Sequence, residues 1–229
     1  MSTLHTQLEA NLRDVRDRIG LACQKAGRSP DEVTLVAVTK YAQIDWIQGL
    51  IDLGVQDFGE NRPQQLVERQ IRWPGVRWHL IGHLQRNKAK VVVGPATLIH
   101  SVDSQRLAQR LAELAVVPLS VLCEVNVSGE ASKEGFAPDE LRALWKELVA
   151  LPQVTIRGLM TMAPLSENAE DARPVFAGLR QLREQLQSLA GVQLPELSMG
   201  MSGDFEVAIE EGATLVRVGS RLFEGLETE

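Results

Sequence analysis

The chain has 229 residues, 44% of them hydrophobic and 24% charged, with a formal net charge of -6 at pH 7. A chain of this length can bury enough apolar surface to fold without disulfide bonds or structural metal ions. The two cysteines, Cys23 and Cys123, lack the spacing of metal ligands. The negative charge argues against general nucleic-acid binding, and no apolar run reaches the roughly 20 residues of a membrane span. Because the N-terminal segment is charged where a signal peptide is apolar, we expect a cytoplasmic protein.

The first predicted element is an amphipathic helix over residues 1–27, which ends at Gly27. Its apolar face comprises Leu8, Leu12, Val15, Ile19 and Ala22. Residues 33–41, VTLVAVTKY, follow as a strand buried on both faces, which is typical of parallel sheets. This apolar run ends at Lys40, where the strand leaves the core.

Strands and helices alternate through the rest of the chain. Helices are predicted at 45–54, from Pro63, after Ser104 as N-cap, from Pro138, at 176–190 and at 204–212. Further strands are predicted at 55–63, 76–84, 96–104, 119–128, 154–162, 196–200 and 213–219. Eight strands that each precede a helix predict an α/β fold of one domain over 1–229, namely a (β/α)8 TIM barrel at 33–223 with the N-terminal helix added. A doubly wound open sheet is the alternative.

Lys40 is the first candidate functional residue. Both folds bind ligands at the carboxyl ends of their strands, so an amine at that place is a candidate nucleophile. A lysine that merely extends its amine to solvent also fits the position.

The loops after the seventh and eighth strands are the second candidate. They read SMGMSGD and VRVGS, and barrels commonly bind phosphate with these two loops. Backbone N–H groups, serine hydroxyls and a helix N-terminus would favour an anion, although such residues also simply form turns. The candidate ligands are Gly200, Ser202, Gly203, Gly219 and Ser220. With Lys40 they predict a ligand that is an aldehyde bearing a phosphate.

Six motifs carry a resemblance to a known family: AVTK at 37–40, FGENRPQQL at 58–66, WHLIGHLQRNK at 78–88, HSVDS at 100–104, GLMTM at 158–162 and LSMGMSGDFEVAIEEGATLVRVGSRLF at 197–223. Together they resemble the pyridoxal phosphate homeostasis proteins of the YggS/PROSC type, whose barrel is similar to the N-terminal domain of alanine racemase. The resemblance implies that Lys40 holds pyridoxal 5'-phosphate (PLP) as a Schiff base. It also implies that Ser202, Gly219 and Ser220 bind the phosphate, that Arg217 faces the pyridine nitrogen, and that Asn61 and Met160 line the pocket.

The chemistry of two residues bears on whether the chain is an enzyme. At a barrel mouth we expect Lys40 to be partly desolvated, which favours its neutral amine. Arg217 has donors only, so the ring nitrogen it faces must stay unprotonated, which weakens the cofactor as an electron sink. A structural ion pair is the alternative role for Arg217.

Racemisation needs a second base, which the resembled racemases supply from a tyrosine backed by a C-terminal β domain and a dimer partner. We expect this chain to end with the barrel. Its one tyrosine, Tyr41, directly follows Lys40 and would point to the opposite face of a strand.

We therefore expect no catalytic residue and a protein that carries or regulates PLP in its homeostasis and in amino- and keto-acid balance. A PLP-dependent racemase or Schiff-base lyase is the alternative, and a protein-interaction module that reports metabolic state is a third hypothesis. The candidate partners are PLP and PLP-dependent apo-enzymes or regulatory proteins, with neither membrane nor nucleic acid, and we expect a monomer.

Two smaller features of the sequence are a pair of histidines and the C-terminal motif. His79 and His83 have the spacing of a helical zinc pair, but on a strand they would lie roughly 13 Å apart, so we predict no metal site. The resembled family ends its last motif in Phe-Gly, whereas here Phe223 precedes Glu224 and Gly225, which puts the tail in question.

Overall fold

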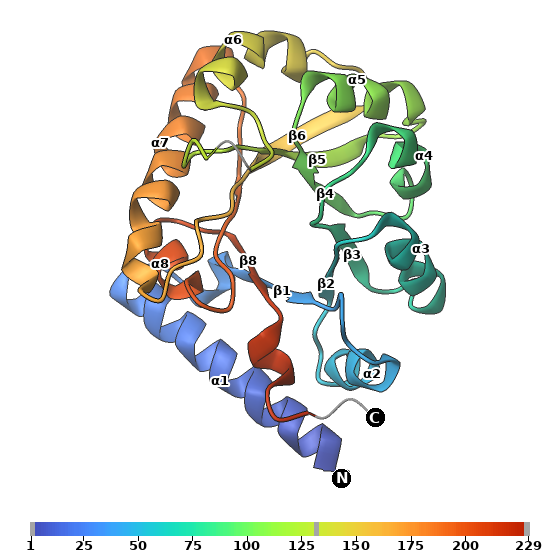
Figure 1. Cartoon of the computed structure of the whole chain (residues 1–229), viewed down its shortest axis with the longest axis vertical. Helices are drawn as coiled ribbons and strands as arrows, with labels where there is room; N and C mark the ends of the chain where they lie inside the picture. The colour runs from blue at the N-terminus through green and yellow to red at the C-terminus, as the bar shows by residue number, and fades with distance from the viewer. Residues whose placement is uncertain (1–2, 131–132, 227–229) are drawn as a thin grey trace.

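The computed structural model describes residues 3–130 and 133–226, and shows a closed barrel of eight parallel strands within a ring of helices (Figure 1). The strands are β1 (Thr34–Val38), β2 (Asp57–Glu60), β3 (Arg77–Leu80), β4 (Leu98–Val102), β5 (Leu119–Glu124), β6 (Val154–Met160), β7 (Glu196–Ser198) and β8 (Leu215–Val218). They pair in chain order, and β8 pairs with β1. The predicted barrel is thus confirmed and the open sheet is wrong, because β1 and β8 leave no free edge. Residues 1–2, 131–132 and 227–229 of the predicted domain lie outside the described residues.

The helices follow the predicted alternation. They are α1 (Thr3–Lys25), α2 (Ile44–Asp52), α3 (Pro63–Arg72), α4 (Ala89–Val92), α5 (Gln105–Leu114), α6 (Pro138–Val149), α7 (Arg173–Ala190) and α8 (Phe205–Glu210), with short 3-10 turns η1 (Pro30–Glu32), η2 (Arg86–Lys88), η3 (Ala169–Ala172) and η4 (Ser220–Phe223). As predicted, the Ser104 hydroxyl caps α5 by accepting a hydrogen bond from the Leu107 N–H at 3.4 Å. A search for membrane-spanning segments among the described helices finds no candidate.

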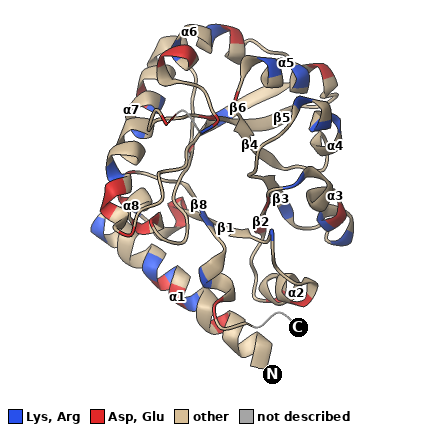
Figure 2. Ribbon diagram, in the orientation of Figure 1, with Lys and Arg blue, Asp and Glu red and all other residues tan. Residues whose placement is uncertain are grey.

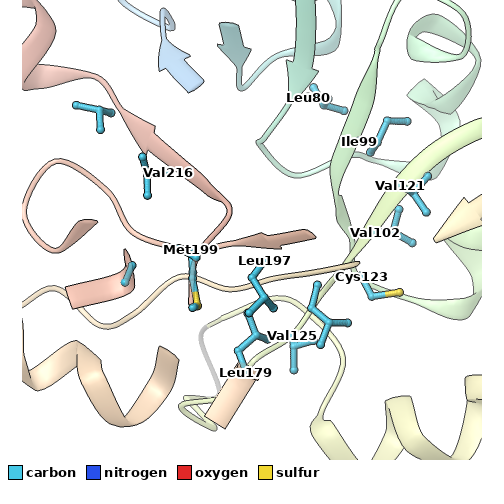
Figure 3. Packing of buried hydrophobic residues seen from close by; sticks show 14 of the residues in the cluster. Leu80, Ile99, Val102, Val121, Cys123, Val125, Leu179, Leu197, Met199 and Val216 are labelled. Carbon is cyan, nitrogen blue, oxygen red and sulfur yellow. The ribbon is translucent and has the colours of Figure 1, made fainter. Parts of the chain in front are cut away.

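The apolar core has two layers because side chains on a strand alternate between its faces. The outer layer packs the strands against the helices, and Figure 3 shows Leu80, Ile99 and Val121 of this layer on neighbouring strands. A smaller cluster, made of Val36, Leu98, Leu122, Met160 and Leu215, fills the inside of the barrel. Most charged residues lie on the outer helices (Figure 2).

The N-terminal helix α1 is an addition to the barrel, as predicted, and lies along α8, α2 and η4 (Figure 1). Its face that bears Leu8, Leu12 and Val15 is buried in the core. Asn11 of α1 donates hydrogen bonds to the carbonyl oxygens of Leu222 at 3.1 Å and Glu224 at 2.9 Å. The helix therefore holds the segment that carries Ser220 at the mouth of the barrel.

Candidate functional site

A pocket of about 670 Å³ opens where β1, β2 and β8 end. The residues that line it include Lys40 after β1, Asn61 after β2, Arg217 on β8, and Ser202 and Ser220 in the two glycine- and serine-containing loops. The barrel therefore brings together residues that lie up to 180 positions apart, between Lys40 and Ser220. All five were predicted to belong to one ligand site.

The backbone at Lys40 is anchored by β2. Thr39, which is buried, donates from its hydroxyl to Glu60 Oε1 at 2.7 Å, and its N–H donates to the Gly59 carbonyl at 3.0 Å. Burial raises the pKa of Glu60, while the bond from Thr39 and the guanidinium of Arg69, 3.7 Å away, act in the opposite direction. Neither Glu60 nor Arg69 was predicted to support the site, although the carboxylates at both ends of strand 57–60 were a visible signal.

The Lys40 side chain is exposed, where we expected partial desolvation. Its Nζ lies 5.0 Å from the centroid of the Tyr41 ring, and among the described residues it has no hydrogen bond or ion pair. Tyr41 lines the same pocket, so the prediction that it points to the opposite face was wrong. The reason is that β1 ends at Val38, and residues 39–42 form a turn closed by the Ala42 N–H bond to the Thr39 carbonyl at 3.0 Å.

The loops after β7 and β8 are tied to each other at the pocket wall. The Gly219 N–H donates to Ser202 Oγ at 3.2 Å, and Arg221 Nε donates to the Ser202 carbonyl at 2.6 Å. A Cβ at Gly219 would lie 3.3 Å from the Val38 carbonyl, so glycine lets the two strand ends approach closely. Within the described part of the chain the Gly203 N–H donates to no group, so it is available to a ligand.

Two further residues shape these loops: Gly200, whose prediction as a phosphate ligand is wrong, and Asp204, which was not predicted. Gly200 has φ +92°, and a Cβ there would lie 2.6 Å from the Ala208 Cβ, so it forms the turn and does not line the pocket. Asp204 accepts a hydrogen bond from the Met201 N–H at 2.6 Å, and burial raises its pKa. Its carboxylate therefore holds the loop in place beside Ser202. With α8 only 6 residues long, loop N–H groups and hydroxyls form this wall rather than the end of a long helix.

Arg217 lies at the floor of the pocket and is 4% exposed. Its Nη1 donates to Ser198 Oγ at 2.6 Å, and its Nη2 donates to the Thr161 carbonyl at 3.0 Å. Burial lowers its pKa to about 10, against the nearby carboxylates of Glu124 and Asp204, so the guanidinium stays charged at neutral pH. Arg217 forms no ion pair with the described carboxylates, which removes the alternative of a simple structural ion pair.

Asn61 and Met160 differ in their placement. Asn61 lines the pocket and is half-buried. Met160 is 1% exposed, belongs to the cluster inside the barrel and does not line the pocket. Met162, two residues further along and beyond the end of β6, lines it instead.

The other side of the barrel mouth carries a cluster of His83, Asp103 and Glu134. Their ligand atoms lie within 4.8 Å of one another, a spacing that could hold a metal ion. His83 Nδ1 lies 3.1 Å from a carboxylate oxygen of Asp103 and 2.5 Å from one of Glu134, so the three side chains contact one another at this nitrogen. His79 is not part of it, because its ring is buried inside the barrel and contacts His100.

Taken together, the pocket has an exposed amine, a wall of hydroxyl and N–H groups, and a buried guanidinium at its floor. An aldehyde would meet the amine, a phosphate would meet the wall, and an acceptor atom on a flat ring would meet the guanidinium. The donor set thus fits an aromatic aldehyde that bears a phosphate.

Comparison with known proteins agrees with this chemistry. The family model described as "Alanine racemase, N-terminal domain" matches residues 6–226. A protein of Aquifex aeolicus named "Pyridoxal phosphate homeostasis protein" is 44% identical over 93% of this chain and 95% of its own length. A protein of the same name from Escherichia coli is 40% identical over 93% of this chain and 94% of its own length.

Solved structures are also similar to this chain. PipY of Synechococcus elongatus, in a structure with PLP bound, has a TM-score of 0.79 at 38% identity, over 91% of this chain and 99% of PipY. An alanine racemase of Clostridium difficile has a TM-score of 0.76 at 15% identity, over 98% of this chain and 58% of the racemase. The racemase therefore shares the fold of the barrel.

Proposed function

Because this chain belongs to the pyridoxal phosphate homeostasis proteins, within the family of the alanine racemase N-terminal domain, we propose that it binds PLP in the pocket at the mouth of its barrel and serves PLP homeostasis. The observation that carries the proposal is that Lys40 and Arg217 open onto one pocket whose wall is formed by Ser202 and Ser220. These residues offer the cofactor an amine for its aldehyde and donors for its ring nitrogen and phosphate.

Each predicted site residue has a role in this proposal. Lys40 bonds through Nζ to the aldehyde carbon as a Schiff base, and one water leaves. Ser202, Gly219 and Ser220 bind the phosphate, Arg217 donates to the ring nitrogen, and Asn61 contacts the cofactor from the end of β2. Met160 supports the floor from inside the barrel. When bound, PLP supplies a reversible covalent link to amines, which suits a carrier.

We further propose that the protein holds and releases PLP rather than turning over a substrate, and so affects amino- and keto-acid balance. The donor-only Arg217 supports this, since an unprotonated ring nitrogen is a weak electron sink. The candidate acceptors of the released PLP are PLP-dependent apo-enzymes or regulatory proteins. In this proposal the protein is a single-domain monomer that contacts them in the cytoplasm.

A second candidate function is residual racemase or lyase chemistry. Tyr41 favours it, because its ring lies beside Lys40 Nζ at 5.0 Å and could place a hydroxyl in the pocket. Tyr41 is 81% exposed, however, so the site provides little exclusion of water around that group. Release of PLP with no turnover on a panel of amino acids would separate the carrier from the enzyme.

The visible absorbance of the purified protein tests the proposal. We expect wild type to gain the absorption band of a Schiff base on addition of PLP, and Lys40→Ala to gain none. Lys90→Ala, an exposed lysine on α4 outside the pocket, should behave as wild type. A wild type that gains no band, or a Lys40→Ala variant that keeps it, would contradict the proposal.

A further inference from the structure

A row of buried polar side chains crosses the inside of the barrel from the floor of the pocket. Arg217 Nη1 lies 2.6 Å from Ser198 Oγ, which lies 2.8 Å from His100 Nδ1. His100 Nε2 lies 2.9 Å from His79 Nδ1, and His79 Nε2 lies 3.0 Å from Asp57 Oδ1. The five residues come from β8, β7, β4, β3 and β2, and each is at most 7% exposed. The row thus links the pocket to the opposite end of the barrel, where Asp57 begins β2.

The far end of this row is a hydrogen-bond acceptor. Arg77 donates to Asp57 from Nε at 2.7 Å and from Nη2 at 2.5 Å. Although burial raises the pKa of Asp57, the bonds from His79 and Arg77 outweigh it and lower the pKa. The ionised carboxylate can only accept, and Arg77 already matches its charge. His79 Nε2, 3.0 Å from this carboxylate, therefore carries a proton and donates it.

The proton positions on the other side chains of the row follow from the hydrogen bond that His79 donates to Asp57. If His79 is a neutral imidazole, its one N–H is at Nε2, so its Nδ1 accepts and His100 donates to it from Nε2. Burial lowers the pKa of His100 well below its usual value, so this ring is neutral. Its Nδ1 accepts from the Ser198 hydroxyl, which itself accepts from Arg217. With a neutral His79, every hydrogen bond between members of the row is therefore donated in the direction away from the pocket.

The hydrogen bonds at this end of the row also orient the guanidinium of Arg217. Ser198 and the Thr161 carbonyl each accept one of its N–H bonds, at 2.6 Å and 3.0 Å, which orients the group and leaves its other N–H groups for the pocket. The charged groups that act on Arg217 from other elements are Glu124 at the end of β5 and Asp204 before α8, and neither forms an ion pair with it within the described structure. The row and the Thr161 carbonyl together thus fix the guanidinium from inside the barrel.

We propose that His79 is a neutral Nε2–H tautomer, and that Asp57, His79, His100 and Ser198 are positioning residues that fix the orientation and the proton order of Arg217 from the far end of the barrel. A ring nitrogen in the pocket then meets a donor and is offered no proton by the row. The inference rests on the proposed function for the identity of that ring. It goes beyond that function because Asp57 does not line the pocket and yet controls the electronic state of a bound cofactor.

The first test needs no cofactor. Nitrogen-proton correlation NMR at pH 8 on protein labelled at its four histidines reports which ring nitrogen of each carries the proton. We expect His79 and His100 to be neutral Nε2–H tautomers, and Asp57→Asn to change the tautomers of both. A proton on His100 Nδ1 in wild type, or a doubly protonated His79 at this pH, would overturn the proton order and with it the proposal.

The second test uses the protein loaded with PLP. Asp57→Asn and Ser198→Ala should shift the pH midpoint of the visible band by roughly one pH unit. The matched control is Ser101→Ala, a buried serine beside His100 on β4 whose hydroxyl donates to the Gly82 carbonyl at 2.6 Å outside the row, and its midpoint should equal that of wild type.

The outcomes separate the two proposals. If Asp57→Asn and Ser198→Ala both keep the wild-type midpoint, the row does not control Arg217 and the inference fails while PLP binding stands. If wild type binds no PLP, the proposed function fails, and the histidine tautomers still decide the proton order. Should Asp57→Asn not fold, wild type and Ser198→Ala carry both tests.

Discussion

Lys40 and Arg217 are two cations of one pocket that the protein treats in opposite ways. Lys40 is exposed with no polar partner among the described residues, so its amine is free to react, whereas Arg217 is buried and held by two acceptors. A nucleophilic amine must be able to move to the carbon that it attacks, whereas a hydrogen-bond donor that recognises a ring must point in one fixed direction. This contrast is the residue-scale basis for assigning attachment to Lys40 and ring recognition to Arg217.

The phosphate wall provides a prediction at this scale. We expect Ser202→Ala to weaken PLP binding about tenfold to hundredfold, because a hydrogen bond to a charged group contributes about 1.5–3 kcal/mol. Binding of pyridoxal, which lacks the phosphate, should change little. Titration by absorbance or fluorescence measures both ligands, with Ser188→Ala on α7 as the control serine. An equal loss for both ligands would show that Ser202 shapes the pocket and does not bind phosphate.

Glu124 provides a prediction about pH. Burial, with the nearby Asp103 and Glu134, raises its pKa to about 7 from 4.5. An acid with a higher pKa when folded reduces stability as pH rises from its unfolded to its folded pKa, since the folded chain resists losing the proton. Glu124→Gln should therefore raise the free energy of unfolding by about 3 kcal/mol at pH 8 and by less than about 1 kcal/mol at pH 5.

Urea unfolding at the two pH values measures this difference. Glu68→Gln, an exposed glutamate on α3, is the control and should have no such pH dependence. A gain from Glu124→Gln that is equal at pH 5 and pH 8 would show that Glu124 is not protonated in the folded protein.

Residue roles were predictable where chemistry alone defines them. A lone lysine at a strand end and small residues after the last two strands pointed to the pocket that the structure contains. The partners of Arg217 were not predictable, because Thr161, for example, lies 56 positions away in the sequence and meets Arg217 only inside the closed barrel. Met160 was misplaced by two residues, which is enough to move a side chain from the pocket to the core.

At the scale of elements, the ends of strands decide the site. The apolar run of 33–41 predicted a strand, but β1 ends at Val38 because Thr39 turns toward Glu60. That turn puts Lys40 and Tyr41 at the same pocket. Hydrophobic pattern identifies a strand well and its last residue poorly, since the end depends on partners from other strands.

The contact between β6 and β7 provides a prediction at this scale. A Cβ on Gly158 would lie 1.8 Å from the Glu196 carbonyl oxygen, and backbone cannot move aside as a flexible side chain can. We expect Gly158→Ala to lower the free energy of unfolding by about 3 kcal/mol, measured by urea denaturation. Gly20→Ala in α1, where a Cβ meets nothing within 4 Å, should instead stabilise by about 0.5–1 kcal/mol. Equal effects of the two variants would contradict the close approach.

At the scale of the whole molecule, closure of the barrel creates the site. The alternation of eight strands with helices predicted the topology, because parallel strands need crossover connections and helices supply them. The pairing of β1 with β8 then brings Lys40 beside the loops of Ser202 and Ser220. The added helix α1 bonds to the segment after η4 and stacks the C-terminal part of the chain against the barrel, where the Phe223 ring meets Trp46 at 5.5 Å.

The most direct test of the central claim is to locate the bond between the protein and PLP. Borohydride reduces a Schiff base to a stable amine, so protein incubated with PLP and reduced can be digested and analysed by mass spectrometry. We predict one adduct per chain, on the peptide that contains Lys40, and none in Lys40→Ala treated in the same way. An adduct spread over several surface lysines, or one that persists in Lys40→Ala at the wild-type yield, would contradict the account.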